Sequence, residues 1–199
     1  MAKVIAIVGS YRADGLNCQV AREILAGAAE AGAETRLVFL PEYDIHFCTN
    51  CRTCTQQPGD KPGKCVHDDA MAELLEACVR ADALVLASPT NMGTVTAIYK
   101  RFIERLTPLA YWPWGRPGPS ARKGIAPKRA VLICSSAAPT IFWRLGGYHT
   151  LAVLRQTAKM FNARVLRVLK YGMVSQHQVP TLTAAQLAAA RACGRRLVA

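Results

Sequence analysis

The sequence predicts a doubly wound α/β fold, a three-layer sandwich in which helices cover both faces of a five-stranded parallel sheet. Five short apolar runs alternate with segments of helical periodicity. The apolar runs are continuous, as in strands that are buried on both faces. A chain of 199 residues is a natural length for one domain. Because crossovers between parallel strands are right-handed, the expected strand order is 2-1-3-4-5.

The expected elements follow one another as five strand–helix units. Strands are expected at residues 3–8, 35–40, 83–87, 130–134 and 164–169. Helices are expected at residues 16–31, 68–80, 95–106, 147–161 and 184–198. Asp68 and Asp69 suit the positive N-terminus of the second helix, and Thr183 suits the cap of the last. Residues 41–66 and 107–127 interrupt this pattern within one expected domain of residues 1–199.

Charge and composition limit the class of protein. The sequence contains no run of 18 or more apolar residues, so no membrane span is expected. The apolar stretch 4–8 is too short for a signal peptide. We therefore expect a cytoplasmic protein whose eight cysteines are thiols or metal ligands. No acidic residue follows Glu104, whereas 15 of the 25 Lys and Arg residues do. Such a basic half attracts phosphate groups, acidic proteins or nucleic acid, or it is simply a solvated surface. Nucleic-acid binding is not expected, because the charge is the only feature that supports it.

Polar loops follow the expected strands at their carboxyl ends, where doubly wound sheets bind ligands. In the first loop, Ser10, Arg12 and Asn17 offer donors beside a helix N-terminus, which favours an anion. A phosphate monoester fits better than a pyrophosphate, because the loop lacks the Gly-x-Gly-x-x-Gly pattern. By spacing alone, a polar turn before a helix is more often a simple helix cap.

The loop after the third expected strand could accommodate a flat ring. It reads Pro89-Thr90-Asn91-Met92-Gly93. Pro89 stiffens the end of the strand, and Gly93 lets the backbone approach a ligand closely. The alternative is a plain turn into the next helix. A further loop after the fourth strand contains Ser135 and Ser136.

Together, these loops resemble those of the NAD(P)H-dependent FMN reductases and iron–sulfur flavoproteins, within the flavodoxin-like superfamily. That group has Gly-Ser-Pro-Arg and then Gly-Asn-Thr or Gly-Asn-Ser, where this chain has Gly9-Ser10-Tyr11-Arg12 and Leu16-Asn17-Cys18. The resemblance implies FMN, with its phosphate on the first loop and its ring on the second, where Asn91 replaces an aromatic residue. The residues expected to contact FMN are Ser10, Arg12, Leu16, Asn17, Cys18, Pro89, Thr90, Asn91, Met92, Gly93, Ser135 and Ser136.

Four cysteines lie in the first interruption. Cys48, Cys51 and Cys54 form C-x2-C-x2-C, and Cys65 follows after ten residues. This resembles the compact motif that ligates a [4Fe–4S] cluster in iron–sulfur flavoproteins. Four thiolates on one loop can also bind zinc. The third interpretation is free thiols on a loop that folds over the flavin or packs at a subunit interface.

The second interruption contains Tyr111, Trp112 and Trp114 among basic residues. It could form a lid over the flavin or a dimer contact, or it could stack nucleic-acid bases. The resemblance implies a homodimer or homotetramer.

The expected function is an FMN-dependent oxidoreductase. Electrons would pass from NAD(P)H to a quinone, an azo or nitro compound, a metal species or a protein. Because the flavin carries the chemistry, no catalytic residue is expected. The alternative is a non-enzymatic electron-transfer flavoprotein, with or without an iron–sulfur cluster, that ferredoxin or another reductase reduces.

Overall fold

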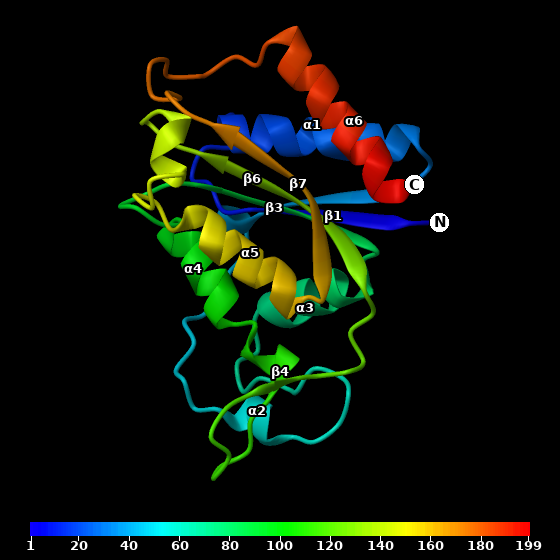
Figure 1. Ribbon diagram of the computed structural model, residues 1–199. Helices are drawn as coiled ribbons and strands as arrows, with labels where there is room; N and C mark the ends of the chain where they lie inside the picture. Colours follow the sequence, from blue (N-terminus) through cyan, green and yellow to red (C-terminus); the bar gives the residue numbers. More distant parts are fainter.

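The computed structural model describes residues 1–199 and contains the expected sheet (Figure 1). Its parallel strands are β1 (Lys3–Val8), β2 (Glu34–Phe39), β3 (Ala83–Pro89), β6 (Lys128–Ser135) and β7 (Ala163–Tyr171). They lie in the order β2-β1-β3-β6-β7, which confirms the predicted order because β6 and β7 are the fourth and fifth strands of this sheet. The inner strands β1, β3 and β6 are almost wholly buried, which explains their continuous apolar sequences.

Helices form a layer on each face of the sheet (Figure 1). One layer contains α1 (Leu16–Glu30) and α6 (Ala184–Val198). The other contains α3 (Met71–Arg80), α4 (Ala97–Glu104) and α5 (Thr150–Met160). The core is accordingly split by the sheet into two groups of buried apolar side chains, one on each face. No helix is both long enough and apolar enough to cross a membrane.

Three helices begin later than their apolar periodicity predicts: α3 at Met71, α4 at Ala97 and α5 at Thr150. The hydroxyl of Thr96 caps α4 by accepting a hydrogen bond from the N–H of Tyr99 at 3.2 Å. Local caps of this kind set where a helix starts, whereas apolar spacing defines only its buried face.

The two interruptions of the strand–helix pattern pack against each other. They form a lobe at the bottom of Figure 1, which we call the cysteine lobe (residues 41–66 and 107–127). The lobe contains α2 (Thr53–Gln56) and the hairpin of β4 (Ala110–Tyr111) and β5 (Ser120–Ala121). Short 3-10 turns occur at Leu40–Glu42, Thr107–Leu109 and, outside the lobe, Thr140–Trp143. The sequence predicts two separate loops, and the structure joins them through bonds such as Trp112 N–H to Thr55 O at 2.9 Å.

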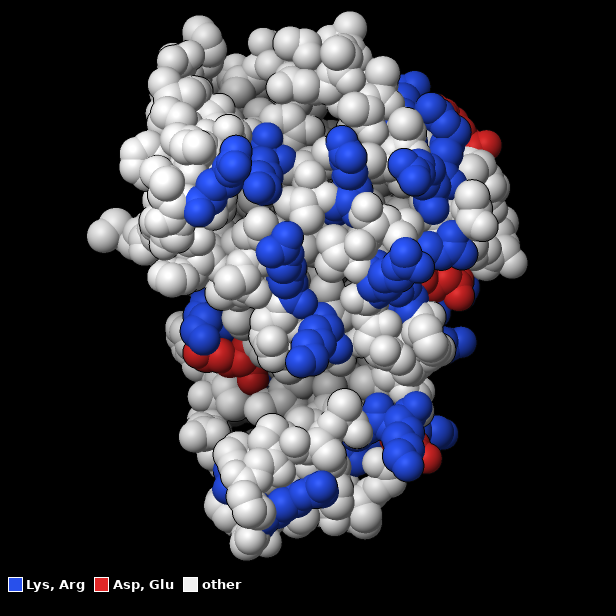
Figure 2. Space-filling model, viewed as in Figure 1, with Lys and Arg blue, Asp and Glu red and all other residues white.

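Lys and Arg side chains spread over the face that β7 and α5 present, and the few acidic side chains in this view lie near its margins (Figure 2). This face belongs to the half of the chain that has no acidic residue.

Helices α1 and α6 touch through two glycines, Gly27 and Gly194. A Cβ atom on Gly194 would overlap the carbonyl oxygen of Ile24. We therefore expect Gly194→Ala to lower the free energy of unfolding by about 1–3 kcal/mol, because the helices must move apart. Urea denaturation measures this loss. The matched control is Gly118→Ala, where an added Cβ meets nothing within 4 Å; an equal loss in both variants would contradict the prediction.

Candidate functional site

Three loops meet at the carboxyl edge of the sheet. The N–H of Gly9 donates to Ala87 O at 2.8 Å and joins the first loop to β3. The N–H of Thr90 donates to Ser135 O at 2.7 Å and joins the second loop to the end of β6. The structure thus brings the sequence-predicted loops into one place, although they are far apart along the chain.

The N-terminus of α1 can accept an anion. Its N-cap, Gly15, has no side chain, and its first turn contains no acidic residue. The N–H groups of Leu16 and Asn17 have no backbone acceptor. Arg12 is exposed, and its own N–H donates to the hydroxyl of Ser10 at 3.2 Å, which closes a local turn in the loop. Unpaired N–H groups at a positive helix end suit the phosphate of FMN.

Two residues predicted to contact the cofactor lie beneath this loop. Asn17 is 3% exposed, and its Nδ2 donates to the hydroxyl of Ser135 at 2.8 Å. Cys18 is fully buried, its N–H donates to Gly15 O, and burial raises the pKa of its thiol to about 11. The Asn17 amide therefore ties α1 to β6, and the Cys18 thiol is a core group.

Residues 91–94 form a tight hairpin turn after β3. Asn91 and Thr94 exchange backbone hydrogen bonds of 2.8 and 3.0 Å. Met92 and Gly93 have φ angles of 47° and 80°, the pair of positive values that a type I′ turn requires. The N–H of His149 donates to Gly93 O at 2.7 Å and holds the turn to the start of α5. Met92 is fully exposed at the tip.

Ser135 and Ser136 are almost completely buried. The N–H of Ser136 donates to Tyr171 O at 2.9 Å, and its hydroxyl donates to Ala138 O at 2.7 Å. The Ser136 hydroxyl therefore stabilises the third loop itself, and the exposed residues of this loop are Ala137 and Pro139.

Sequence reasoning missed the hydrogen bonds that hold the loops together, although Tyr11 and Thr90 lie in the predicted loops. The hydroxyl of Thr96 donates to Gly9 O at 2.6 Å. Tyr11 Oη accepts from the N–H of Ile98 at 3.1 Å and so joins the first loop to α4. The hydroxyls of Thr90 and Thr150 lie 2.8 Å apart. The position of Thr96 just before a helix is a sequence signal, whereas nothing local points to the other two pairs.

The four cysteines of the lobe differ in exposure. Cys54 is buried, Cys48 and Cys65 are half-buried and Cys51 is exposed. Burial raises the pKa of the Cys54 thiol, and hydrogen bonding to Thr53 lowers that of Cys51. No three Cys, His, Asp or Glu side chains lie close enough together to hold a metal ion. The donor chemistry suits a cluster or zinc, but the thiols would have to draw together.

Arg122 organises the cysteine lobe from within. It is 5% exposed, and its guanidinium donates to carbonyl oxygens at 2.8–3.1 Å. The acceptors are Cys54, Gln57, Gly59 and Pro108. A planar guanidinium with several fixed donors is suited to such a set. The backbone of the cysteine loop is therefore positioned by a residue from the second interruption.

The aromatic residues of the second interruption pack on the same loop. The guanidinium carbon of Arg52 lies 3.9 Å from the ring centroid of Trp112 and 4.1 Å from that of Trp114. Arg52 Nη2 also donates to Trp112 O at 2.8 Å. Cation–π contacts with Arg52 thus hold both tryptophan rings within the cysteine lobe.

A buried ion pair joins the lobe to the main fold. The side chains of Asp69 and Arg105 are each 1% exposed, and their atoms approach to 2.5 and 3.0 Å. Arg105 also donates to His46 O at 2.8 Å and to Cys65 Sγ at 3.5 Å. Burial by itself raises the pKa of Asp69. Hydrogen bonds from Arg105 and from the N–H groups of His46 and Met71 outweigh burial and lower that pKa to about 2.

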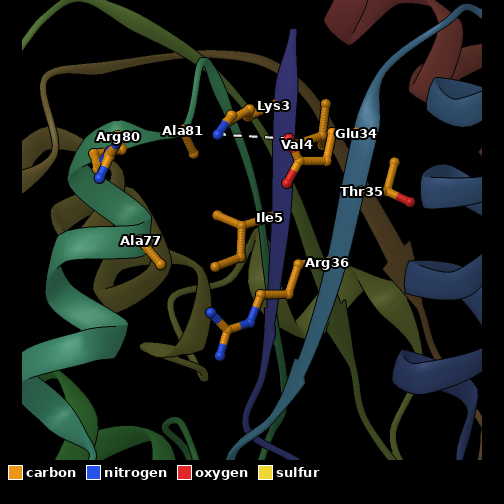
Figure 3. A pocket seen from close by; sticks show the side chains of 9 residues that line it. All are labelled: Lys3, Val4, Ile5, Glu34, Thr35, Arg36, Ala77, Arg80 and Ala81. Atoms are coloured by element: carbon orange, nitrogen blue, oxygen red, sulfur yellow. Dashed lines mark ion pairs between the residues drawn. The ribbon is translucent and has the colours of Figure 1, made fainter. Parts of the chain in front are cut away.

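Two of the hollows on the surface border α3. One, of about 260 Å³, is at the amino end of the sheet between β1, β2 and α3, where Lys3 pairs with Glu34 at 3.5 Å (Figure 3). The other, of about 890 Å³, lies between α3 and the cysteine lobe and is bordered by Cys65 and Arg105. Neither contains a residue predicted to contact FMN.

A parallel sheet in the order β2-β1-β3-β6-β7, with an uncapped helix N-terminus and three loops at its carboxyl edge, defines a flavodoxin-like fold. The chain belongs to the NADPH-dependent FMN reductase family, whose profile matches residues 2–178. Family membership confirms the resemblance that the sequence motifs predicted.

Curated relatives share about a third of the aligned residues. An iron–sulfur flavoprotein of Methanocaldococcus jannaschii is 36% identical over 107 residues, 54% of this chain and 53% of the relative. One of Methanosarcina thermophila is 35% identical over 104 residues, 52% of this chain and 51% of the relative. The chain thus spans about half the length of the curated relatives it matches.

Solved structures share the fold over nearly the whole chain. A flavone reductase matches with a TM-score of 0.69 at 17% identity, covering 98% of this chain and 62% of its own. The NAD(P)H:quinone oxidoreductase of Methanothermobacter marburgensis matches with a TM-score of 0.66 at 20% identity, covering 99% and 98%. An FMN-dependent NADH-azoreductase of Bacillus anthracis, solved with FMN, has a TM-score of 0.70 at 10% identity and covers 100% of both chains. At these identities the similarity confirms the fold alone.

Proposed function

We propose that the protein is an FMN-dependent oxidoreductase that takes electrons from NAD(P)H and passes them to a small conjugated acceptor. The observation that carries this proposal is the uncapped N-terminus of α1 beside the two other loops. Bound FMN supplies the hydride and electron chemistry. Family membership supports FMN as the cofactor.

The residues of this chain position the cofactor. The N–H groups of Leu16 and Asn17 and the guanidinium of Arg12 bind the phosphate. Backbone groups of residues 90–93 border the ring. Tyr11 and Thr96 hold the two loops in register through their hydrogen bonds to Ile98 and Gly9.

The names of the structural neighbours guide the choice of acceptor. They describe reductases of flavones, quinones and azo compounds, all of which are flat conjugated molecules. We therefore favour a quinone or an azo compound over nitro compounds, metal species or a protein acceptor.

The decisive experiment begins with an absorbance spectrum and an FMN titration of the purified protein. Rapid NADPH oxidation on addition of a quinone supports the reductase. Slow NADPH oxidation combined with fast reduction by ferredoxin would instead support the electron carrier. If the protein binds no FMN and its melting temperature does not rise with excess FMN, both the reductase and the electron-carrier hypotheses are refuted.

Arg12→Ala tests the phosphate site. We expect FMN affinity to fall by about 10- to 100-fold, because a charge-assisted hydrogen bond is lost from the complex. Fluorescence titration of the FMN-free protein measures the affinity, and the melting temperature without FMN should not change. The control Lys123→Ala removes an exposed cation of the cysteine lobe. Equal losses of FMN affinity in the two variants would show that the net positive charge of the protein, and not Arg12 itself, attracts the phosphate.

The proposal extends to an iron–sulfur cluster held by Cys48, Cys51, Cys54 and Cys65. It is supported by four thiols on one organised loop and by the names of the curated relatives. Anaerobic preparation followed by iron and acid-labile sulfide analysis tests it. Cys54→Ser should abolish the iron, and Cys193→Ser, outside the lobe, should not. Zinc in place of iron, or metal-free protein, would contradict the cluster.

We also propose self-association through the rim of the flavin site. Large apolar side chains are exposed there on all three loops, namely Tyr11, Met92, Ile141, Phe142 and Leu145. Exposed apolar and aromatic groups of this kind are typical of subunit interfaces.

A further inference from the structure

The face formed by β7 and its neighbours carries six exposed cations without counter-ions. They are Arg144, Arg155, Lys159, Arg164, Arg167 and Lys170. None of their side chains makes an ion pair or a hydrogen bond within the chain, and Figure 2 shows several separate blue side chains across this face with few red ones. By contrast, Arg191 and Arg195 on α6 pair with Glu23 and Glu30 of α1. The cations of α6 are therefore neutralised by carboxylates, whereas the six cations of this face are not. Uncompensated like charges that lie close together repel one another.

A groove crosses the charged face between β7 and the first turns of α6. Its volume is about 530 Å³. The apolar part of its lining consists of Val168, Leu169, Ala185 and Ala189. Its charged part consists of Arg144, Arg167 and Lys170. An apolar floor beside a basic rim fits an acidic surface that also carries apolar side chains.

The strand itself is protected against pairing with another strand. β7 is an edge strand that bonds only to β6. Its register shifts so that Val165 and Arg167 face consecutive residues of β6 and Leu166 has no partner. A bulge and edge cations both oppose strand addition. Pairing of this face with the same face of a second copy would bring like charges together. Neither strand addition nor such a dimer therefore explains the groove.

Nucleic acid fits the groove less well than a protein does. Single-stranded nucleic acid is bound by stacking of bases on exposed aromatic rings beside cations. The only aromatic residue that lines the groove is Tyr171, which is 9% exposed. Trp112 and Trp114 stack on Arg52 in the cysteine lobe instead.

We propose that this groove, with Arg144, Arg167 and Lys170 at its rim, docks the acidic surface of a partner protein. Charge complementarity attracts the partner and the apolar floor receives its apolar side chains. Tyr171 lines the groove, and its carbonyl accepts the N–H of Ser136 in the third loop. A docked protein therefore lies one strand away from the loop that borders the flavin. Any exchange of electrons at this distance rests on the proposed function, whereas docking does not.

A fluorescent amphipathic peptide of alternating Glu and Leu blocks is the probe, and an all-Glu peptide and a single-stranded oligonucleotide of equal charge are the comparisons. Anisotropy titrations use the full chain, with and without FMN. The rim variant is Arg167→Glu with Lys170→Glu. Lys61→Glu with Lys64→Glu is the matched control, because it changes the net charge equally at exposed positions of the cysteine lobe. Circular dichroism establishes that both variants fold.

We expect the Glu/Leu peptide to bind more tightly than either comparison and its affinity to fall with salt. The rim variant should weaken binding by about tenfold or more, and the control by less than about twofold. Equal weakening in both variants overturns the proposal, as does tighter binding of the oligonucleotide or no binding of the peptide. Peptide binding to FMN-free protein keeps this result separate from any failure to bind FMN.

Discussion

Replacing Asp69 with asparagine is expected to lower the free energy of unfolding by about 3–5 kcal/mol. The substitution leaves Arg105 charged, 1% exposed and without its carboxylate. An unpaired buried charge of this kind is among the most costly defects in a folded protein. Urea denaturation measures the loss. Asp68→Asn, at the exposed neighbouring position, is the matched control and should change the stability by no more than about 0.5 kcal/mol.

The same pair makes stability depend on pH in a defined window. The folded-state pKa of Asp69, about 2, is below its ordinary value of 3.8. The unfolded chain therefore binds the proton first as pH falls, and the contribution of Asp69 is complete above 3.8 and is lost as pH falls toward 2. The stability difference between the wild type and Asp69→Asn should shrink over this range. A difference that stays constant from neutral pH to pH 2 would contradict the assignment.

The pair also tests whether residues 1–199 form one cooperative unit. Asp69 lies just before α3 and Arg105 just after α4, and Arg105 contacts His46 and Cys65 of the cysteine lobe. We propose a single domain, so that tryptophan fluorescence of a Trp143→Phe variant, whose two remaining tryptophans lie in the lobe, and far-UV circular dichroism from the helices should report one transition. Replacement of both partners by Asp69→Leu and Arg105→Met should restore part of the stability, because no buried charge remains.

Replacing Arg122 with methionine is expected to loosen the cysteine lobe and to cost about 3 kcal/mol. Four carbonyl oxygens lose a charged donor, including that of Cys54. Limited proteolysis should cut residues 41–66 faster, and urea denaturation should show the loss of stability. If the proposed cluster is bound, its iron content should fall as well.

Two further variants make the Arg122 prediction specific. Arg122→Lys should recover less than half of the loss, because one ammonium group cannot reach four carbonyls in the plane of a guanidinium. Lys123→Ala changes the adjacent exposed cation and should leave proteolysis unchanged. Protection of the lobe in Arg122→Met equal to that in the wild type would show that the lobe holds together without this residue.

The arrangement of the three loops at the carboxyl edge could be predicted only in part. The position of Ser10, Arg12 and Gly93 at the carboxyl edge could be predicted from the sequence because loops after parallel strands collect at one edge of the sheet. The burial of Asn17 against Ser135 could not, because the two residues are 118 positions apart and neither has a local partner. Tyr11 was visible only as a departure from a motif, and its bond to Ile98 gives it a structural reason.

The cysteine lobe lay beyond local reasoning. The spacing of Cys48, Cys51 and Cys54 was evident, but the elements that position them come from residues 107–127. Arg122 resembles any other surface arginine in sequence, whereas in the fold it is 5% exposed among carbonyl oxygens. Asp69 was expected to stabilise a helix N-terminus. It does accept the N–H of Met71, but its main partner is Arg105, 36 residues away.

The sequence by itself determined the strand order, the layer arrangement and the edge at which the loops gather, because buried parallel strands and helix periodicity leave direct traces in the order of apolar residues. It also determined the unequal distribution of charge. Only the tertiary structure decided which cations are paired and which of the predicted site residues face outward. It also decided that two distant interruptions form one lobe. Those outcomes depend on contacts between residues far apart in the chain, and such contacts are set by how the layers pack and not by any local pattern.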